Sequence, residues 1–148
     1  MSYNEGWKVS EVTNEFDDDK LDYVLYEGDC ECGRVEIEVL YESYEYEFMS
    51  ILSEAEFAKE FRSEPIVKIS RVEVPLPHRG KGIATHLLKE TFKQLRLAGF
   101  TQWFLNASPL DENGPSLFQL ENFYTKFGFR REQLRNESTL MWFADDLN

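Results

Sequence analysis

Residues 66–84 have the sequence IVKISRVEVPLPHRGKGIA, and this stretch decides the fold. Residues 66–74 are rich in β-branched side chains, which favour a strand. Pro75 and Pro77 cannot continue a central strand, because proline has no backbone N–H to donate. From Arg79 the pattern becomes helical, and Gly99 is placed to end the helix. The apolar stripe of this helix consists of Ile83, Ala84, Leu87, Leu88, Thr91, Phe92 and Leu95. We therefore expect a strand, a glycine-containing loop and an amphipathic helix in succession.

The loop has the residue types of an anion-binding site. Gly80 and Gly82 allow the backbone to approach a ligand closely, and the first N–H groups of a helix have no partner within it. Arg79 and Lys81 add positive charge to the helix dipole, which suits a pyrophosphate. Residues 68–100 carry 7 basic and 2 acidic side chains. The stretch matches neither a Walker loop nor a Rossmann fingerprint, and an ordinary glycine-rich turn is the alternative interpretation.

The segments before this stretch have the period-two pattern of strands with one solvated face. The residues from Gly28 to Gly33 are expected to form the turn of a hairpin. Ser53 and Glu56 fit a capping box, which predicts a short helix. We expect strands at 7–12, at 35–41 and at 44–48, a further strand that begins at 21, and a helix at 53–62.

The segments after the helix predict a second strand, helix and hairpin. Residues 101–107 favour a strand, and Ser116 with Gln119 forms a capping box for a further helix. Gly128 suits the end of that helix. Residues 129–134 and 139–143 are then expected to form a closing hairpin.

The length of 148 residues predicts one domain over residues 1–148. The formal net charge is −12, and residues 1–64 hold 19 acidic and 5 basic side chains. An acidic protein repels nucleic acid and attracts a cationic acceptor such as an amine, although solubility alone also explains the charge. We therefore expect no nucleic-acid partner.

The sequence predicts no membrane span, no secretory signal and a cytoplasmic location. The two cysteines, Cys30 and Cys32, are separated by one residue, and such a pair bridges only with strain. The two histidines, His78 and His86, lie far from them along the chain. We expect no metal site on this ground. Apolar strand edges could pair two chains, so a homodimer stays open.

The sequence resembles the GNAT superfamily of N-acetyltransferases. In the cofactor motif of that family an Arg or Gln is followed after two residues by Gly, and after one more by Gly or Ala. Arg79, Gly82 and Ala84 match it. Residues 123–129, FYTKFGF, are similar to the second motif of the family. The connection from Asn106 to Leu117 is similar to that of small phage or prophage members.

The resemblance implies a fold and a cofactor. The fold would be α/β (α+β), with a mixed, mostly antiparallel central sheet, splayed fourth and fifth strands and flanking helices. The cofactor would be acetyl-CoA, with its thioester in the gap between those strands. Its pantetheine arm would pair with the backbone of Val72 to Val74. The residues expected to surround its pyrophosphate are Arg79, Gly80, Lys81, Gly82, Ile83, Ala84 and Thr85.

The catalytic residues expected from the sequence are Tyr124 and Glu73. A phenol can protonate the departing thiolate, and Tyr124 lies where the family often places such a tyrosine. The alternative interpretation is that Tyr124 is an aromatic side chain of the core. Glu73 is the favoured base for the incoming ammonium, with Asp111, Glu112 and Glu121 as alternatives or with water as a relay. It could instead face solvent or pair with a basic neighbour.

Asn106 is expected to orient the cofactor or the acceptor, or else to form an ordinary polar strand end. The family usually has two helices after the first strand, and here only residues 13–20 stand there. We expect the 53–62 helix and the Leu110-to-Pro115 loop to line the acceptor site instead.

These features together predict an N-acetyltransferase that acts on a small-molecule or protein amine by direct attack in a ternary complex. Two alternatives stay open. One is a module that binds acyl-CoA without turnover. The other is an acidic interaction protein with a basic partner.

Overall fold

A computed structural model describes residues 6–13, 17, 19–40, 65–109, 112, 114–133 and 139–144. The chain divides into two compact units, residues 1–38 with 69–100 and residues 39–68 with 101–148, and each is described by itself. The strands form a seven-stranded sheet in the order β1-β2-β3-β4-β5-β7-β6. The fold class is confirmed as a mixed, mostly antiparallel sheet with helices. The single domain over residues 1–148 stays a prediction.

The first unit is built on the strands β1 (Trp7–Thr13), β2 (Lys20–Glu27) and β3 (Cys30–Leu40), with most of β4 (Ile66–Glu73). β2 pairs antiparallel with β1 on one side and with β3 on the other. Tyr23, Val24 and Leu25 are all buried, which places the core of the unit at the middle of β2.

The β2–β3 turn is shorter than the sequence predicts. It occupies only Gly28 and Asp29, and Cys30 already pairs with Glu27. The expectation of a turn over residues 28–33 was wrong because Gly28, with φ 62°, supplies the positive dihedral that a two-residue hairpin turn needs. The residues from Cys30 to Gly33 are therefore free to extend the strand.

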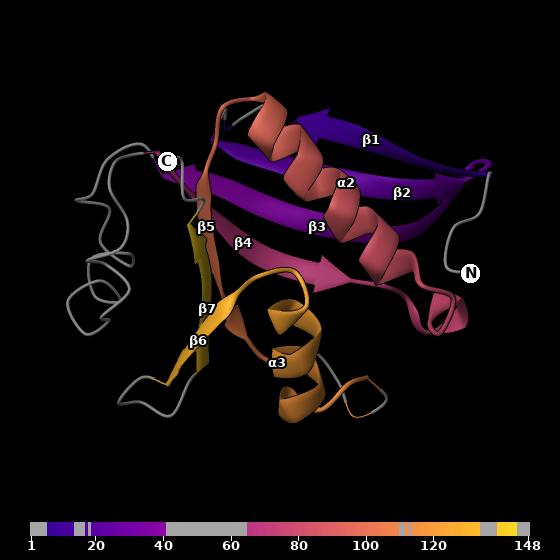
Figure 1. Ribbon diagram of the computed structural model, residues 1–148. Helices are drawn as coiled ribbons and strands as arrows, with labels where there is room; N and C mark the ends of the chain where they lie inside the picture. The colour runs from indigo at the N-terminus through magenta and orange to yellow at the C-terminus, as the bar shows by residue number, and fades with distance from the viewer. Residues whose placement is uncertain are drawn as a thin grey trace. The chain divides into compact units, whose positions relative to one another are not determined.

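Helix α2 (Ile83–Leu97) lies across the face of β1, β2 and β3 (Figure 1). Its buried side chains match the predicted stripe except for Ala84, which is half-buried. The helix begins at Ile83 rather than at Arg79, because the positive φ angles of Gly80 and Gly82 interrupt helical geometry. At its other end Phe100 and Gly99 donate to the carbonyls of Leu95 and Arg96, which is a Schellman cap.

The second unit contains β5 (Gln102–Ala107), β6 (Arg130–Gln133), β7 (Thr139–Ala144) and α3 (Leu117–Thr125). β7 pairs antiparallel with β5 and with β6. β4 runs parallel to β5, and they pair at Val67–Trp103 and Lys68–Phe104, near the beginning of β4. The predicted capping box is confirmed, because the N–H of Gln119 donates to the Ser116 hydroxyl at 3.2 Å and the Gln119 side chain accepts from the Ser116 N–H.

Several predicted elements lie outside the described residues. These are the strand at 44–48, the helix at 53–62 and most of the loop from Leu110 to Pro115. Among the helices that the structure describes, none has both the length and the apolar character needed to cross a membrane. The cytoplasmic location stays a prediction.

Candidate functional site

The glycine-containing loop connects β4 to α2 and is held by its own backbone. After β4 the chain forms the short 3-10 helix η2 (Leu76–His78), and the Arg79 N–H donates to the Leu76 carbonyl at 3.2 Å. The Arg79 side chain donates from Nε to the Val74 carbonyl at 2.7 Å. This bond joins the loop to the end of β4. Arg79 therefore shapes the loop as well as carrying a charge.

Both loop glycines adopt a conformation that other residues rarely tolerate. Gly80 and Gly82 each have φ of 82°, in the left-handed region that favours glycine. A Cβ on Gly80 would meet no atom within 4 Å, so only the backbone angle demands glycine there. The structure thus supplies the physical reason for the two glycines, which is the positive φ angle at each position.

The N-terminus of α2 has the electrostatics of an anion site. Its N-cap residue is Gly82, so no side chain caps the helix, and the first turn contains no acidic residue. The first N–H groups of such a helix need an external acceptor, and the helix dipole adds about half a positive charge. Lys81 is exposed beside this end, and Ala84 and Thr85 are half-buried in the first turn. The predicted pyrophosphate-binding residues are thereby brought together in one unit.

Close packing against β3 fixes the start of α2. A Cβ on Gly33 would lie 2.9 Å from the Ile83 methyl group, 3.3 Å from Leu87 and 3.5 Å from Val74. Glycine at this point lets the helix approach the strand closely. Ile83 is only 2% exposed, so its side chain belongs to the core.

The end of β4 carries three further predicted site residues. Val72, Glu73 and Val74 are all half-buried. The Glu73 carboxylate forms an ion pair with Arg71, and its side chain is 41% exposed. The two residues are two positions apart in a strand, so their side chains share a face. The structure thus has the basic neighbour that our alternative interpretation of Glu73 anticipated.

Tyr124 lies in the second unit, near the end of α3. It is 6% exposed, and its ring packs edge-on against Phe123 and Phe129 with centroid distances of 5.3 and 5.6 Å. Burial raises the pKa of the Tyr124 hydroxyl to about 12. The phenol is therefore protonated at neutral pH.

Glu121, one turn before Tyr124, links α3 to the closing hairpin. Its carboxylate accepts from Arg131 Nε at 2.8 Å and from the Thr139 hydroxyl at 3.0 Å. The Glu121 side chain is only 13% exposed. Both carboxylate oxygens are thus engaged, and Glu121 has the contacts of a residue that positions α3.

We expect Glu121→Ala to lower the free energy of unfolding by about 1 to 2 kcal/mol, because charge-assisted hydrogen bonds contribute about 1.5–3 kcal/mol and Arg131 is half exposed. Urea unfolding followed by tryptophan fluorescence measures the change. Glu112→Ala, at an exposed carboxylate, is the control and should leave stability within about 0.5 kcal/mol. Equal stability of the two variants would contradict the linking role.

Two of the remaining residues that the sequence proposed for the site are exposed to solvent. Asn106 lies in β5, where its exposed side chain interrupts a buried run. Glu112 is exposed, and Asp111 lies outside the described residues.

One cluster of possible metal ligands was not predicted from the sequence. The fold brings His78 of η2 beside Cys30 and Cys32 at the start of β3, although 45 residues lie between Cys32 and His78 in the chain. The expectation of no metal site rested on that separation. The two closely spaced cysteines were the available signal, but their approach to His78 depends on the hairpin turn at Gly28, which returns β3 along β2.

The sequence model of the acetyltransferase (GNAT) family matches residues 2–129. No curated protein matches the chain. Among solved structures, the PaiA N-acetyltransferase from Thermoplasma acidophilum in complex with coenzyme A matches with a TM-score of 0.58 and 16% identity. That match covers 86% of this chain and 62% of the other, so this chain spans less than two thirds of that protein.

Two further structures match over most of the chain. Arabidopsis thaliana NAA60 in complex with a bisubstrate analogue has a TM-score of 0.57 and 17% identity, with 86% of this chain and 77% of that one covered. An acetyltransferase from Thermus thermophilus has a TM-score of 0.57 and 16% identity, with 90% and 68% covered. At such identities the likeness shows the fold alone.

Proposed function

The chain belongs to the acetyltransferase (GNAT) family, and from this premise we propose that it transfers an acetyl group from acetyl-CoA to an amine. The observation that carries the proposal is the loop between β4 and α2. It combines two positive-φ glycines, an uncapped helix N-terminus and the cations Arg79 and Lys81.

These residues fit the pyrophosphate of coenzyme A. An α-helix without a capping side chain or a first-turn carboxylate leaves its N-terminal donors for an external anion. We propose that the backbone from Gly80 to Thr85 donates to the phosphate oxygens and that Lys81 adds charge. The backbone of Val72 and Val74 would hold the pantetheine arm. Bound acetyl-CoA supplies the thioester, which is the activated acyl group of the reaction.

Tyr124 is our proposed general acid. When the amine nitrogen bonds to the acetyl carbon, the carbon–sulfur bond breaks and the sulfur leaves as a thiolate that requires a proton. The buried phenol carries that proton at neutral pH, because burial raises its pKa to about 12. It would donate a hydrogen bond to the departing sulfur and then transfer the proton. Asn106, exposed on β5, is proposed to orient the cofactor.

Glu73 is our proposed base for the ammonium form of the acceptor. Its carboxylate is 41% exposed, so an amine or a water relay can reach it. Glu121 is a weaker candidate, because Arg131 and Thr139 already engage both of its oxygens. The amine must lose one proton before attack, to Glu73 or a water relay, and a second as the amide forms; overall one proton stays on the free thiol and the other passes to solvent.

A cationic acceptor suits the charge of the protein. The formal net charge of −12 attracts ammonium groups and repels phosphate backbones, so we propose a small-molecule or protein amine and no nucleic acid.

The proposal is tested by thiol release with acetyl-CoA and a panel of amines that includes a polyamine, a lysine-containing peptide and a peptide with a free N-terminus. We expect turnover with at least one amine, detected as free coenzyme A thiol and as acetylated product by mass spectrometry. Binding of acetyl-CoA without turnover on any amine would favour the binding module. An absence of binding, with salt-sensitive affinity for a basic partner, would favour the interaction protein.

A further inference from the structure

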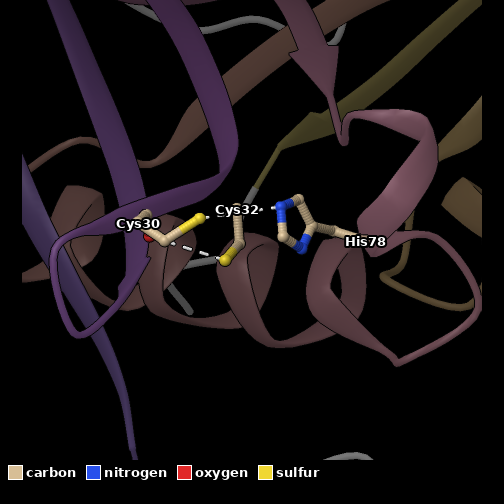
Figure 2. Close-up of side chains that lie close together, drawn as sticks. All are labelled: Cys30, Cys32 and His78. Atoms are coloured by element: carbon tan, nitrogen blue, oxygen red, sulfur yellow. Dashed lines mark hydrogen bonds between the residues drawn. The ribbon is translucent and has the colours of Figure 1, made fainter.

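Cys30, Cys32 and His78 form a cluster that the proposed reaction does not use. One ligand atom from each residue lies within 4.8 Å of the other two, and Cys30 Sγ is 3.7 Å from His78 Nε2. Figure 2 shows both sulfur atoms and the imidazole ring facing one another. The cluster lies wholly within the first unit, where η2 meets the beginning of β3.

A β-bulge places the second cysteine in this cluster. Leu25 pairs with Gly33 and Tyr26 with Glu31, so Cys32 is the extra residue and has no partner in β2. Bulges change the direction of a side chain relative to the regular pleat. Cys32 is fully buried while Cys30 is exposed, so the cluster has one protected sulfur and one that solvent reaches.

The three side chains form a soft donor set with the spacing of a metal site. Two thiolates and one imidazole favour Zn²⁺ or Cu⁺ among common cations. With metal–sulfur bonds of about 2.3 Å and metal–nitrogen bonds of about 2.0 Å, tetrahedral zinc holds its ligand atoms roughly 3.5–3.8 Å apart. The distance of 3.7 Å between Cys30 Sγ and His78 Nε2 already lies in this range.

Charge favours zinc over copper. Two thiolates and a neutral imidazole carry a charge of −2, which Zn²⁺ neutralises and Cu⁺ does not. Since Cys32 is fully buried, a neutral complex avoids the cost of burying an uncompensated charge. Each thiol releases its proton to solvent when the metal binds.

A thiol–imidazole hydrogen bond alone does not account for the cluster. Such a contact involves only Cys30, and sulfur is a weak partner. Within the part of the chain that the structure describes, His78 Nδ1 is buried without a hydrogen-bond partner. A weak hydrogen bond to sulfur offsets little of the free-energy cost of burying an imidazole nitrogen. A metal ion on His78 Nε2 would form a stronger bond than this sulfur contact, and it would also bind the sulfur of Cys32, whose thiol otherwise donates to the Cys30 carbonyl at 3.5 Å.

We propose that Cys30, Cys32 and His78 bind one zinc ion, with a solvent molecule or a further ligand in the fourth position. The metal would link β3 to η2, immediately before Arg79. It would thereby fix the entrance to the glycine-containing loop. The proposed zinc binding does not rest on the proposed acetyl transfer, since none of the three ligands belongs to the proposed reaction.

The test uses the reduced, metal-free chain and Co²⁺ as a spectroscopic substitute for zinc. Stoichiometric Co²⁺ should produce thiolate-to-cobalt charge-transfer absorption and strong visible bands typical of tetrahedral coordination, and Zn²⁺ should displace both. Zinc affinity is then measured by competition with a chromophoric chelator. We expect Cys30→Ser and His78→Gln each to weaken zinc binding by more than about 100-fold, because loss of even an outer-shell partner costs about 10–100-fold.

His86→Gln is the matched control, since it removes the other histidine of the chain and should leave zinc affinity unchanged. Cys30 is exposed, so its replacement keeps the fold, which circular dichroism checks. Absence of the thiolate-to-cobalt absorption with the wild-type chain would overturn the proposal. Equal zinc affinity in the wild type, Cys30→Ser and His78→Gln would overturn it as well, because binding would then lie elsewhere on the acidic surface.

Discussion

Replacing Gly82 by Asp is expected to lower the affinity for acetyl-CoA by at least about 100-fold. The new carboxylate would stand at the N-cap of α2, where it could accept the N–H groups that we assign to the pyrophosphate. It would also repel the phosphates, since two like charges about 4 Å apart cost roughly 4 kcal/mol near a protein surface. A change of about 1.4 kcal/mol in binding free energy is a tenfold change in affinity. Screening by salt reduces the repulsion below its full value. Isothermal titration calorimetry measures the dissociation constants.

Two variants separate charge from backbone strain. Gly82→Ala introduces the strain of a side chain at φ 82° without a charge and should weaken binding much less than Gly82→Asp. Gly99→Asp adds the same charge at another positive-φ glycine beyond the opposite end of α2. A helix of 15 residues is about 22 Å long, which exceeds the Debye length in ordinary buffer. Gly99→Asp should therefore bind acetyl-CoA normally. Equal losses in the two Asp variants would place the cofactor elsewhere.

The sequence predicted the loop and α2 because each depends on local rules. The apolar spacing from Ile83 to Leu95 specifies one buried helix face, and glycine permits the positive φ values of Gly80 and Gly82. The capping box of Ser116 and Gln119 is equally local. Such features need only neighbouring residues, so the pattern of the chain contains them.

The features that the sequence could not predict depend on long-range pairing. The turn at Gly28 sets the register of β3, and the bulge at Cys32 shifts it by one residue. Neither follows from composition, because the GDCECG segment fits a longer turn equally well. The approach of His78 to Cys30 depends on that register and on η2 together.

The ion pair of Glu73 with Arg71 was anticipated only as an alternative, since alternation within a strand allows both pairing and exposure.

Replacing Tyr124 by Phe should lower kcat by about 100-fold to 10,000-fold, which is the usual contribution of a positioned acid, and should leave acetyl-CoA affinity unchanged. Phe fills the same buried space without the hydroxyl, so the fold should persist. Tyr23→Phe is the matched control. Tyr23 is also buried and donates to Glu11 at 3.2 Å, but it lies in β2 of the first unit and has no proposed role in the reaction. It should keep kcat near the wild-type value.

The pH dependence gives an independent test of the same role. A general acid works while it is protonated, so its activity is lost as pH rises through its pKa. Because burial raises the pKa of Tyr124 to about 12, kcat should show no decline from this group up to about pH 10. The rise of kcat/KM with pH should instead follow deprotonation of the acceptor amine. If Tyr124→Phe retained full kcat, the departing thiolate would have to take its proton from solvent, and Tyr124 would be a core aromatic of α3.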